Sequence, residues 1–168
     1  MHGDKRRTLI ITELCNSHQA ISANQFARKF GVSRQIIVGD IALCRAQGHD
    51  IIATGKGYII NQVDEHSKIY TLAMQHKHQD TRKELELFIK HHAQVLDVTV
   101  EHPIYGQLTG QLNIQSHEDI DQFMDKKPEL LASLTNGIHL HRIAVSDEDD
   151  YNALIEDLKQ HHFLYQSN

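Results

Sequence analysis

The chain has no tryptophan, only two prolines and two cysteines among its 168 residues, and 6% aromatic residues. Cys15 and Cys44 lie far apart in helical-looking segments, which excludes a disulfide framework and a Cys-x-x-Cys metal or redox site. Both are expected to fill cores. The sequence also lacks the run of about 18 apolar residues that a membrane span needs and the apolar stretch of a signal peptide. We therefore expect a cytoplasmic protein.

Charge of either sign is unevenly distributed. The net charge is −5, yet residues 1–60 carry eight Lys and Arg against four acids, a net of +4 that leaves −9 for the rest. This asymmetry indicates a basic module with a polyanionic partner joined to an acidic body, although small domains also differ in charge by accident. A hydrophobic content of 40% suffices for two small cores. We expect domains at 1–62 and 67–168.

The basic module is predicted to contain three short helices. The first covers about 5–16, and Ser22 begins the second with a capping-box pattern. Gly31 ends that helix, and Ser33 caps a third one that stops near Gly48. A tight glycine turn between the second and third helices predicts a helix-turn-helix.

Two strand-like runs, 51–54 and 57–60, surround a Gly-Lys-Gly turn and predict a hairpin, which completes a winged helix. In this fold the start of the third helix enters the major groove, while basic residues meet phosphates. Gly39 inside that helix is unfavourable by about 1 kcal/mol relative to alanine, and close packing is the only reason that the sequence offers. The alternative is a protein-interaction domain without nucleic acid. The predicted DNA contacts are Ser33, Arg34 and Gln35 at base edges, and Lys29 and Lys56 at phosphates.

The acidic body follows a polar boundary at 61–67 and has the pattern of an α+β domain. The segment 128–134 is open between helix and loop, and a helix at 148–161 with a short strand at 163–165 extends the motif. The order βαββαβ is that of the ferredoxin-like split motif. The expected elements are strand 68–75, helix 82–93, strands 95–101 and 107–115, helix 117–126 and strand 138–145. The residues at 68–75 could also form a helix.

His139 and His141 project from the same face of the last strand, because successive side chains alternate between faces. They are about 7 Å apart along the backbone and can lean toward one ion. A protein metal site needs three or four ligands. With 14 histidines in the chain, some His-x-His pairs also arise by chance.

The ferredoxin-like motif supplies the missing ligands. It places the first strand antiparallel to the last, so that His76 and His78 lie beside His139 and His141, and Glu84 on the following helix returns to the same edge. Histidines with one carboxylate and no cysteine suit Zn²⁺, Ni²⁺ or Fe²⁺.

Each candidate has a structural alternative. Thr81 and Glu84 also form a capping box, in which the carboxylate turns back to the helix start, and His78 suits a solvated loop. His102, in a tight turn, is predicted at the opposite end of the sheet and outside the ligand set of its own chain. Histidines near helix ends interact favourably with the helix dipole and are expected to be structural or exposed: His91, His92, His161 and His162.

A metal with an open position also suits a hydrolase. The sequence has no Ser-His-Asp-type elbow, no His-Glu-x-x-His helix and no Gly-rich phosphate loop. These absences disfavour a metal-dependent hydrolase fused to a winged helix, including one of the biotin-ligase type. A repressor in which the ion itself is the signal stays open as a second alternative.

Five segments carry a family resemblance that covers nearly the whole chain. They are Val-Ser-Arg-Gln-Ile-Ile-Val-x-Asp-Ile at 32–41, Ile-Ile-Ala-Thr at 51–54, Gly-Tyr at 57–58, Glu-His-Pro-Ile-Tyr-Gly at 101–106 and Gly-Ile-His-Leu-His at 137–141. In these segments the chain resembles the niacin-responsive transcriptional repressors, which join a winged helix-turn-helix domain to a 3H domain.

The resemblance implies repression of genes for NAD synthesis or niacin uptake, with nicotinic acid as corepressor and a divalent metal in the 3H domain. A metal with an open position can accept the carboxylate of nicotinate, and His102 and Tyr105 can meet the pyridine ring if a second chain brings them near. We expect a homodimeric, ligand-gated repressor of operator DNA, not an enzyme. The family's ligand spacing selects His76, Glu84, His139 and His141.

Overall fold

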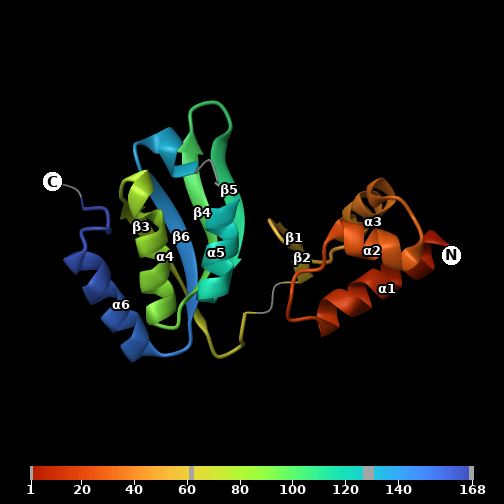
Figure 1. The fold of residues 1–168 in the computed structure, drawn as a ribbon, viewed down its shortest axis with the longest axis horizontal. Helices are drawn as coiled ribbons and strands as arrows, with labels where there is room; N and C mark the ends of the chain where they lie inside the picture. The colour runs from red at the N-terminus through yellow and green to blue at the C-terminus, as the bar shows by residue number, and fades with distance from the viewer. Residues whose placement is uncertain (1, 61–62, 127–130, 167–168) are drawn as a thin grey trace. The chain divides into compact units, whose positions relative to one another are not determined.

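The computed structural model describes residues 2–60, 63–126 and 131–166. The chain divides into two compact units, residues 1–62 and residues 63–168 (Figure 1). No helix in the described parts of the chain is long and apolar enough to cross a membrane.

The first unit contains three helices followed by a two-stranded antiparallel hairpin, as the sequence predicted. Its core is formed by Ile10, Leu14, Phe26, Ile37 and Ile41 together with Ala23, Ala27, Cys44 and Ile51. The order of elements is that of a winged helix. They are α1 (Gly3–Asn16), α2 (Ala23–Phe30), α3 (Arg34–Ala46), β1 (Ile51–Thr54) and β2 (Gly57–Ile60).

The predicted helix caps are present. The Ser22 side chain accepts from the Gln25 N–H, and the Gln25 side chain accepts from the Ser22 N–H, which completes a capping box at α2. Ser33 accepts from the Ile36 N–H at the start of α3. Gly31 ends α2 at φ 66°, a conformation that favours glycine. These caps set the turn between α2 and α3.

One of the two cysteines departs from the expectation. Cys44 is buried in the core, whereas Cys15 is exposed, so the prediction that both fill cores is wrong for Cys15. The buried stripe of α1 passes through Arg6, Ile10 and Leu14, which leaves Cys15 beside the stripe.

The second unit contains a four-stranded antiparallel sheet in the order β3-β6-β4-β5. The short strand predicted at 163–165 is reduced to a bridge between Leu164 and Met74. The regular elements are β3 (Lys68–Gln75), η1 (His78–Asp80), α4 (Thr81–Lys90), β4 (Gln94–His102), β5 (Gly106–Ile114), α5 (His117–Asp125), η2 (Leu131–Thr135), β6 (Ile138–Val145) and α6 (Glu148–Gln160).

The α+β class and the βαββαβ order are confirmed, and the first and last strands pair antiparallel as predicted. The strand order differs from the ferredoxin-like one, because β6 lies inside the sheet between β3 and β4 while β3 forms an edge. Burial explains this placement: β4 and β6 carry more buried side chains than β3 and β5. Of the open segment 128–134, residues 128–130 lie outside the described residues, and η2 covers the remainder.

The predicted position of His102 is wrong. Strands β3 and β4 each pair antiparallel with β6, so they are parallel to each other and end on the same side. Gln75 pairs with Ile138, and Thr99 pairs with Leu140. The helix between β3 and β4 returns the chain to the starting side of the sheet, which makes the two strands parallel. His102 therefore lies at the same end as His76.

Helices α4, α5 and α6 cover one face of the sheet (Figure 1). Side chains at alternate positions of β3 and β6 point into this layer, among them Leu72, Met74 and Ile143. Phe88 of α4 and Leu154 of α6 are fully buried against them. His139 and His141 share this face because they are separated from Ile143 by even numbers of residues.

Asp157 of α6 joins the ends of two helices. Its carboxylate accepts from His91 Nε2 at 2.8 Å and from Lys90 Nζ at 2.9 Å, and its backbone carbonyl accepts from His161 Nδ1. The hydrogen bond from His91 and the nearby Lys90 ammonium lower the pKa of Asp157 from 3.8 to about 2. The expectation that His91 and His161 are structural fits these contacts.

Replacing Asp157 with asparagine is expected to lower the free energy of unfolding by about 1 kcal/mol at pH 7, after allowance for solvent screening. A depressed folded-state pKa stabilises the protein above the unfolded-state value, and this contribution disappears as the pH falls toward about 2. Urea unfolding at pH 7, 4 and 3 should show the difference shrinking. Asp150→Asn, at a looser pair with exposed His92, is the control. A constant difference across this range contradicts the assignment.

Candidate metal centre and nucleic-acid interface

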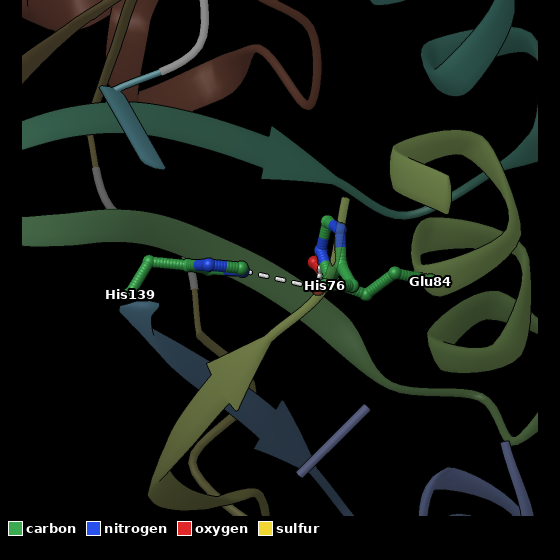
Figure 2. Close-up of side chains that lie close together, drawn as sticks. All are labelled: His76, Glu84 and His139. Carbon is green, nitrogen blue, oxygen red and sulfur yellow. Dashed lines mark hydrogen bonds and ion pairs between the residues drawn. The ribbon is translucent and has the colours of Figure 1, made fainter. Parts of the chain in front are cut away.

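Four side chains from three segments of the body converge beneath the sheet. His76 follows the end of β3, Glu84 lies on the first turn of α4, and His139 and His141 belong to β6. Their side chains are between 1% and 4% exposed. The strands bring His76 and His139 together because Gln75 pairs with Ile138 in the register of β3 with β6. Figure 2 shows His76, Glu84 and His139.

The carboxylate of Glu84 is the centre of the cluster. His139 Nε2 lies 3.0 Å from Glu84 Oε2, and His76 Nε2 also contacts Oε2. His141 Nε2 lies 2.5 Å from the other oxygen, Oε1. The donor atoms of His76, Glu84 and His139 all lie within 4.8 Å of one another. His141 therefore approaches the same carboxylate from its second oxygen.

The opposite nitrogen of each imidazole is held by a backbone carbonyl. His76 Nδ1 lies 2.8 Å from Lys77 O, His139 Nδ1 lies 2.8 Å from Gly137 O, and His141 Nδ1 lies 2.7 Å from Asp97 O. A carbonyl only accepts, so each Nδ1 carries a proton and donates it. In the neutral imidazole, Nε2 then presents a lone pair. All three lone pairs face the Glu84 carboxylate.

Lone pairs facing a carboxylate repel unless a proton or a cation lies between them. His76 Nε2 is buried against Glu84 Oε2 without the geometry of a hydrogen bond, and an unsatisfied buried polar atom is costly. Three protonated imidazoles would place a net charge of about +2 in a buried site, which is also unfavourable. One divalent cation would satisfy the carboxylate and the three imidazoles together. The donor set fits such an ion.

The electrostatics of the site favour positive charge beside the Glu84 carboxylate. Burial alone would raise the pKa of Glu84, but the imidazoles of His141, His139 and His76 outweigh it and lower this pKa well below its usual range. Burial lowers the pKa of His141, but the Glu84 carboxylate outweighs burial and raises it. The carboxylate is therefore ionised and available as a ligand.

The capping-box alternative for Glu84 is wrong. The residue before α4 is Asp80, whose side chain forms no cap, and Thr81 Oγ1 donates to His78 O instead. Glu84 is 1% exposed and points at the histidines. His78 is exposed in η1, as expected of a loop residue.

Gly137 determines how closely His76, after the end of β3, approaches the start of β6. Its φ is +83°, and a Cβ at this position would overlap the carbonyl oxygen of His76. Only glycine lets the backbone of His76 pack against the start of β6. Neither this contact nor the backbone carbonyls that hold each Nδ1 was predicted from sequence.

A cavity opens beside the four side chains. Its wall on one side is His76, Glu84, His139 and His141, and Thr81 also contributes. The remaining lining is apolar and comes from α4, β4, β5, α5 and η2. It consists of Leu85, Val98, Leu112, Phe123, Leu131 and Ala132. This arrangement places the four polar side chains beside an apolar lining.

The two candidate effector residues lie elsewhere in the chain. His102 Nδ1 accepts from the N–H groups of Ile104 and Tyr105, which orders the tip of the β4–β5 hairpin. Tyr105 is 73% exposed and Ile104 is 81% exposed. Neither His102 nor Tyr105 lines the cavity beside Glu84.

Comparisons with known proteins place both units in one family. A family model described as the 3H domain matches residues 69–167, and one described as an HTH domain matches residues 6–59. The probable transcription repressor NiaR of Thermotoga maritima is 34% identical over 165 residues, which cover 95% of this chain and 93% of the relative. The chain belongs to the niacin-responsive repressor family. The transcription repressor NadR of Bacillus subtilis is 32% identical over 165 residues, 94% of this chain and 92% of the relative.

The helix-turn-helix domain of this repressor presents the start of α3 to solvent. Arg34, Gln35 and Ile36 are exposed, and Ser33 uses its hydroxyl to cap the helix. Ile36 is 45% exposed and was not predicted as a contact, although an apolar side chain at a major-groove helix can meet a thymine methyl group.

The basic residues predicted at phosphates differ in their surroundings. Lys29 Nζ pairs with Glu13 Oε1 of α1 at 2.6 Å, so binding a phosphate would require it to leave that partner. Lys56 is exposed in the turn between β1 and β2. Arg34 lies between the groove along α2 and the hairpin turn, where it lines both hollows.

Proposed function

We propose that this repressor binds a divalent metal in its 3H domain and binds operator DNA with nicotinic acid as corepressor, to control genes for NAD synthesis or niacin uptake. The observation that carries the proposal is the orientation of the four donors. Three imidazoles present Nε2 to one ionised carboxylate, with each Nδ1 fixed by a carbonyl. Such backbone hydrogen bonds orient metal-ligating histidines in proteins. Zn²⁺, Ni²⁺ and Fe²⁺ suit this donor set.

In this proposal nicotinic acid binds beside these donors, and the cavity, about 40 Å³, widens to admit its ring. A bound cation would supply a Lewis-acidic centre for the carboxylate of the effector. The aliphatic side chains and Phe123 that line the cavity would hold the flat pyridine ring away from water. The cavity favours this function over that of a pure metal sensor, because a sensor that responds to the ion alone needs no adjoining apolar space.

Features of both units support a homodimer. Two winged heads that read two half-sites need matched spacing, which a dimeric body supplies. Helices cover one face of the body sheet, whereas Ile69 and Ile138 on the opposite face are 50% and 36% exposed. In such a dimer the exposed hairpin tip, with His102 and Tyr105, can reach the effector site of the second chain. The effector can change the affinity for DNA only if it binds more tightly to one placement of the two heads than to another.

DNA contacts in this proposal come from the start of α3 and the hairpin turn. Arg34 and Gln35 would read base edges, while Ser33 holds the helix start in place. Lys56 and, after release from Glu13, Lys29 would bind phosphates.

Nicotinic acid is expected to tighten binding to an operator duplex by about tenfold or more, within the usual range of coupling between two sites. The duplex is first selected from a random library with metal-loaded protein and nicotinic acid. Fluorescence anisotropy then compares nicotinic acid with nicotinamide, which has the same ring but no carboxylate.

Three results distinguish the alternatives. Tighter binding with the acid alone supports the proposed corepressor. A switch caused by Ni²⁺ or Zn²⁺ without any pyridine compound would instead support the metal sensor. An affinity for the operator duplex that does not change with metal, nicotinic acid or chelator would contradict the proposal as a whole.

A further inference from the structure

Gly39 occupies an unfavourable position in the recognition helix. It lies in the interior of α3, at the sixth of 13 residues, and is exposed. Glycine is the poorest helix former after proline because it loses the most backbone freedom on folding. A residue that weakens the helix in this way needs a compensating reason.

The described part of the chain supplies no such reason. A Cβ built on Gly39 would meet no heavy atom within 4 Å, whereas a Cβ on Gly57 would overlap the backbone of Ile21. Gly39 is also absent from the residues with positive φ, where glycine is favoured. Close packing, the reason that the sequence suggested, therefore does not apply within the chain.

The direction of Gly39 is fixed by the helix. Ile37, Ile41 and Cys44 form the buried side of α3. Gln35 and Gly39 are four residues apart and share the opposite side, which faces solvent. Gln35 is one of the residues expected at base edges, so Gly39 lies one turn further along the same outward surface.

We propose that Gly39 is the point of closest approach between α3 and double-stranded DNA, and that it determines which duplex the repressor prefers. Without a side chain, the helix axis can lie deeper in the major groove, and Gln35 and Ile36 can reach the base pairs. A methyl group at this position would separate the helix from the groove. This inference rests on DNA binding in the proposed function and not on the effector.

The test compares wild-type protein with Gly39→Ala on two duplexes. One duplex is selected from a random library by the wild-type protein, and the other is a scrambled sequence of equal length. Gly39→Ala is expected to bind the selected duplex about tenfold more weakly, the effect of disturbing one base contact. Binding to the scrambled duplex depends on phosphates and should change less than about twofold.

Thermal unfolding separates this loss from damage to the fold. Gly39→Ala should raise the unfolding midpoint of the domain by roughly 4 °C, since alanine favours the helix and meets no neighbour. Thr8→Ala is the matched control, because Thr8 is an exposed residue of α1 whose replacement favours a helix outside the reading surface. It should raise stability without changing affinity for either duplex.

Weaker binding by a more stable Gly39→Ala protein supports the inference. Undiminished binding to the selected duplex would overturn it. All affinities are measured at one concentration of Ni²⁺ and nicotinic acid. A wild-type protein that binds the duplex but ignores nicotinic acid would count against the proposed corepressor and leave the comparison of the two variants intact.

Discussion

Replacing Glu84 with glutamine is expected to lower the affinity for Ni²⁺ or Zn²⁺ by more than about 100-fold, because even changes outside the ligand set cost 10- to 100-fold in metal sites. Glu84 supplies the only negative charge in the cluster, and three imidazoles approach its two oxygens. Isothermal titration calorimetry of protein stripped by a chelator measures this loss. The response of DNA binding to nicotinic acid should disappear with the metal.

The glutamine variant is suited to this test because it should fold without metal. Its amide NH₂ group can donate to the Nε2 lone pairs of His76 and His139, which share one oxygen of the carboxylate in the wild type. Glu86→Gln is the control on the same helix: this side chain is 44% exposed and makes only a long pair with Arg82. Metal affinity in Glu84→Gln equal to that in Glu86→Gln would contradict the assigned role of Glu84.

Replacing Gly137 with alanine is expected to destabilise the body by more than about 3 kcal/mol and to weaken metal binding. The added Cβ would overlap the carbonyl oxygen of His76 at a positive φ, so that both strain and a backbone collision oppose it. Relief of the collision moves His76 away from Glu84. Urea unfolding and calorimetry with Ni²⁺ measure the two effects.

Gly106→Ala separates the collision from the backbone strain. Gly106 also has a positive φ, of +72°, but a Cβ there meets no described atom within 4 Å. This variant should lose only about 1 kcal/mol and keep its metal affinity. Equal losses in the two variants would show that the contact between Gly137 and His76 does not position the site.

Much of the fold was predictable because its signals are local. Ser22, Ser33 and Gly31 mark the helix ends that the structure contains. The alternation of side chains between two faces in residues 138–145 predicted the bounds of β6 and the shared face of His139 and His141. These features depend on neighbouring residues, whose spacing the sequence states directly.

Features that depend on distant residues were harder to predict. The interior position of β6 follows from burial of whole strands, which no short pattern contains. The position of His102 was mistaken because it required the relative direction of two strands joined by a helix. The capping-box pattern at Thr81 and Glu84 was ambiguous. The Glu84 carboxylate faces His76, His139 and His141 in the fold, and the local pattern around Thr81 does not show this.

The supports of the candidate site were also beyond sequence reasoning. Backbone carbonyls of Lys77, Gly137 and Asp97 accept hydrogen bonds from the imidazoles. Every residue has a backbone carbonyl, so residue type does not show which ones take this role. Gly137 was noticed within a motif, but its necessity becomes clear only where the backbone of His76 lies against it.

The most direct test of the account is anomalous X-ray scattering from crystals of the protein grown with Ni²⁺ or Zn²⁺, recorded on both sides of the metal absorption edge. We expect a peak about 2.0–2.2 Å from Nε2 of His76, His139 and His141 and from a Glu84 oxygen. A peak only at another cluster, such as Asp157 with His91, or no peak beside Glu84 in metal-saturated crystals, would contradict it.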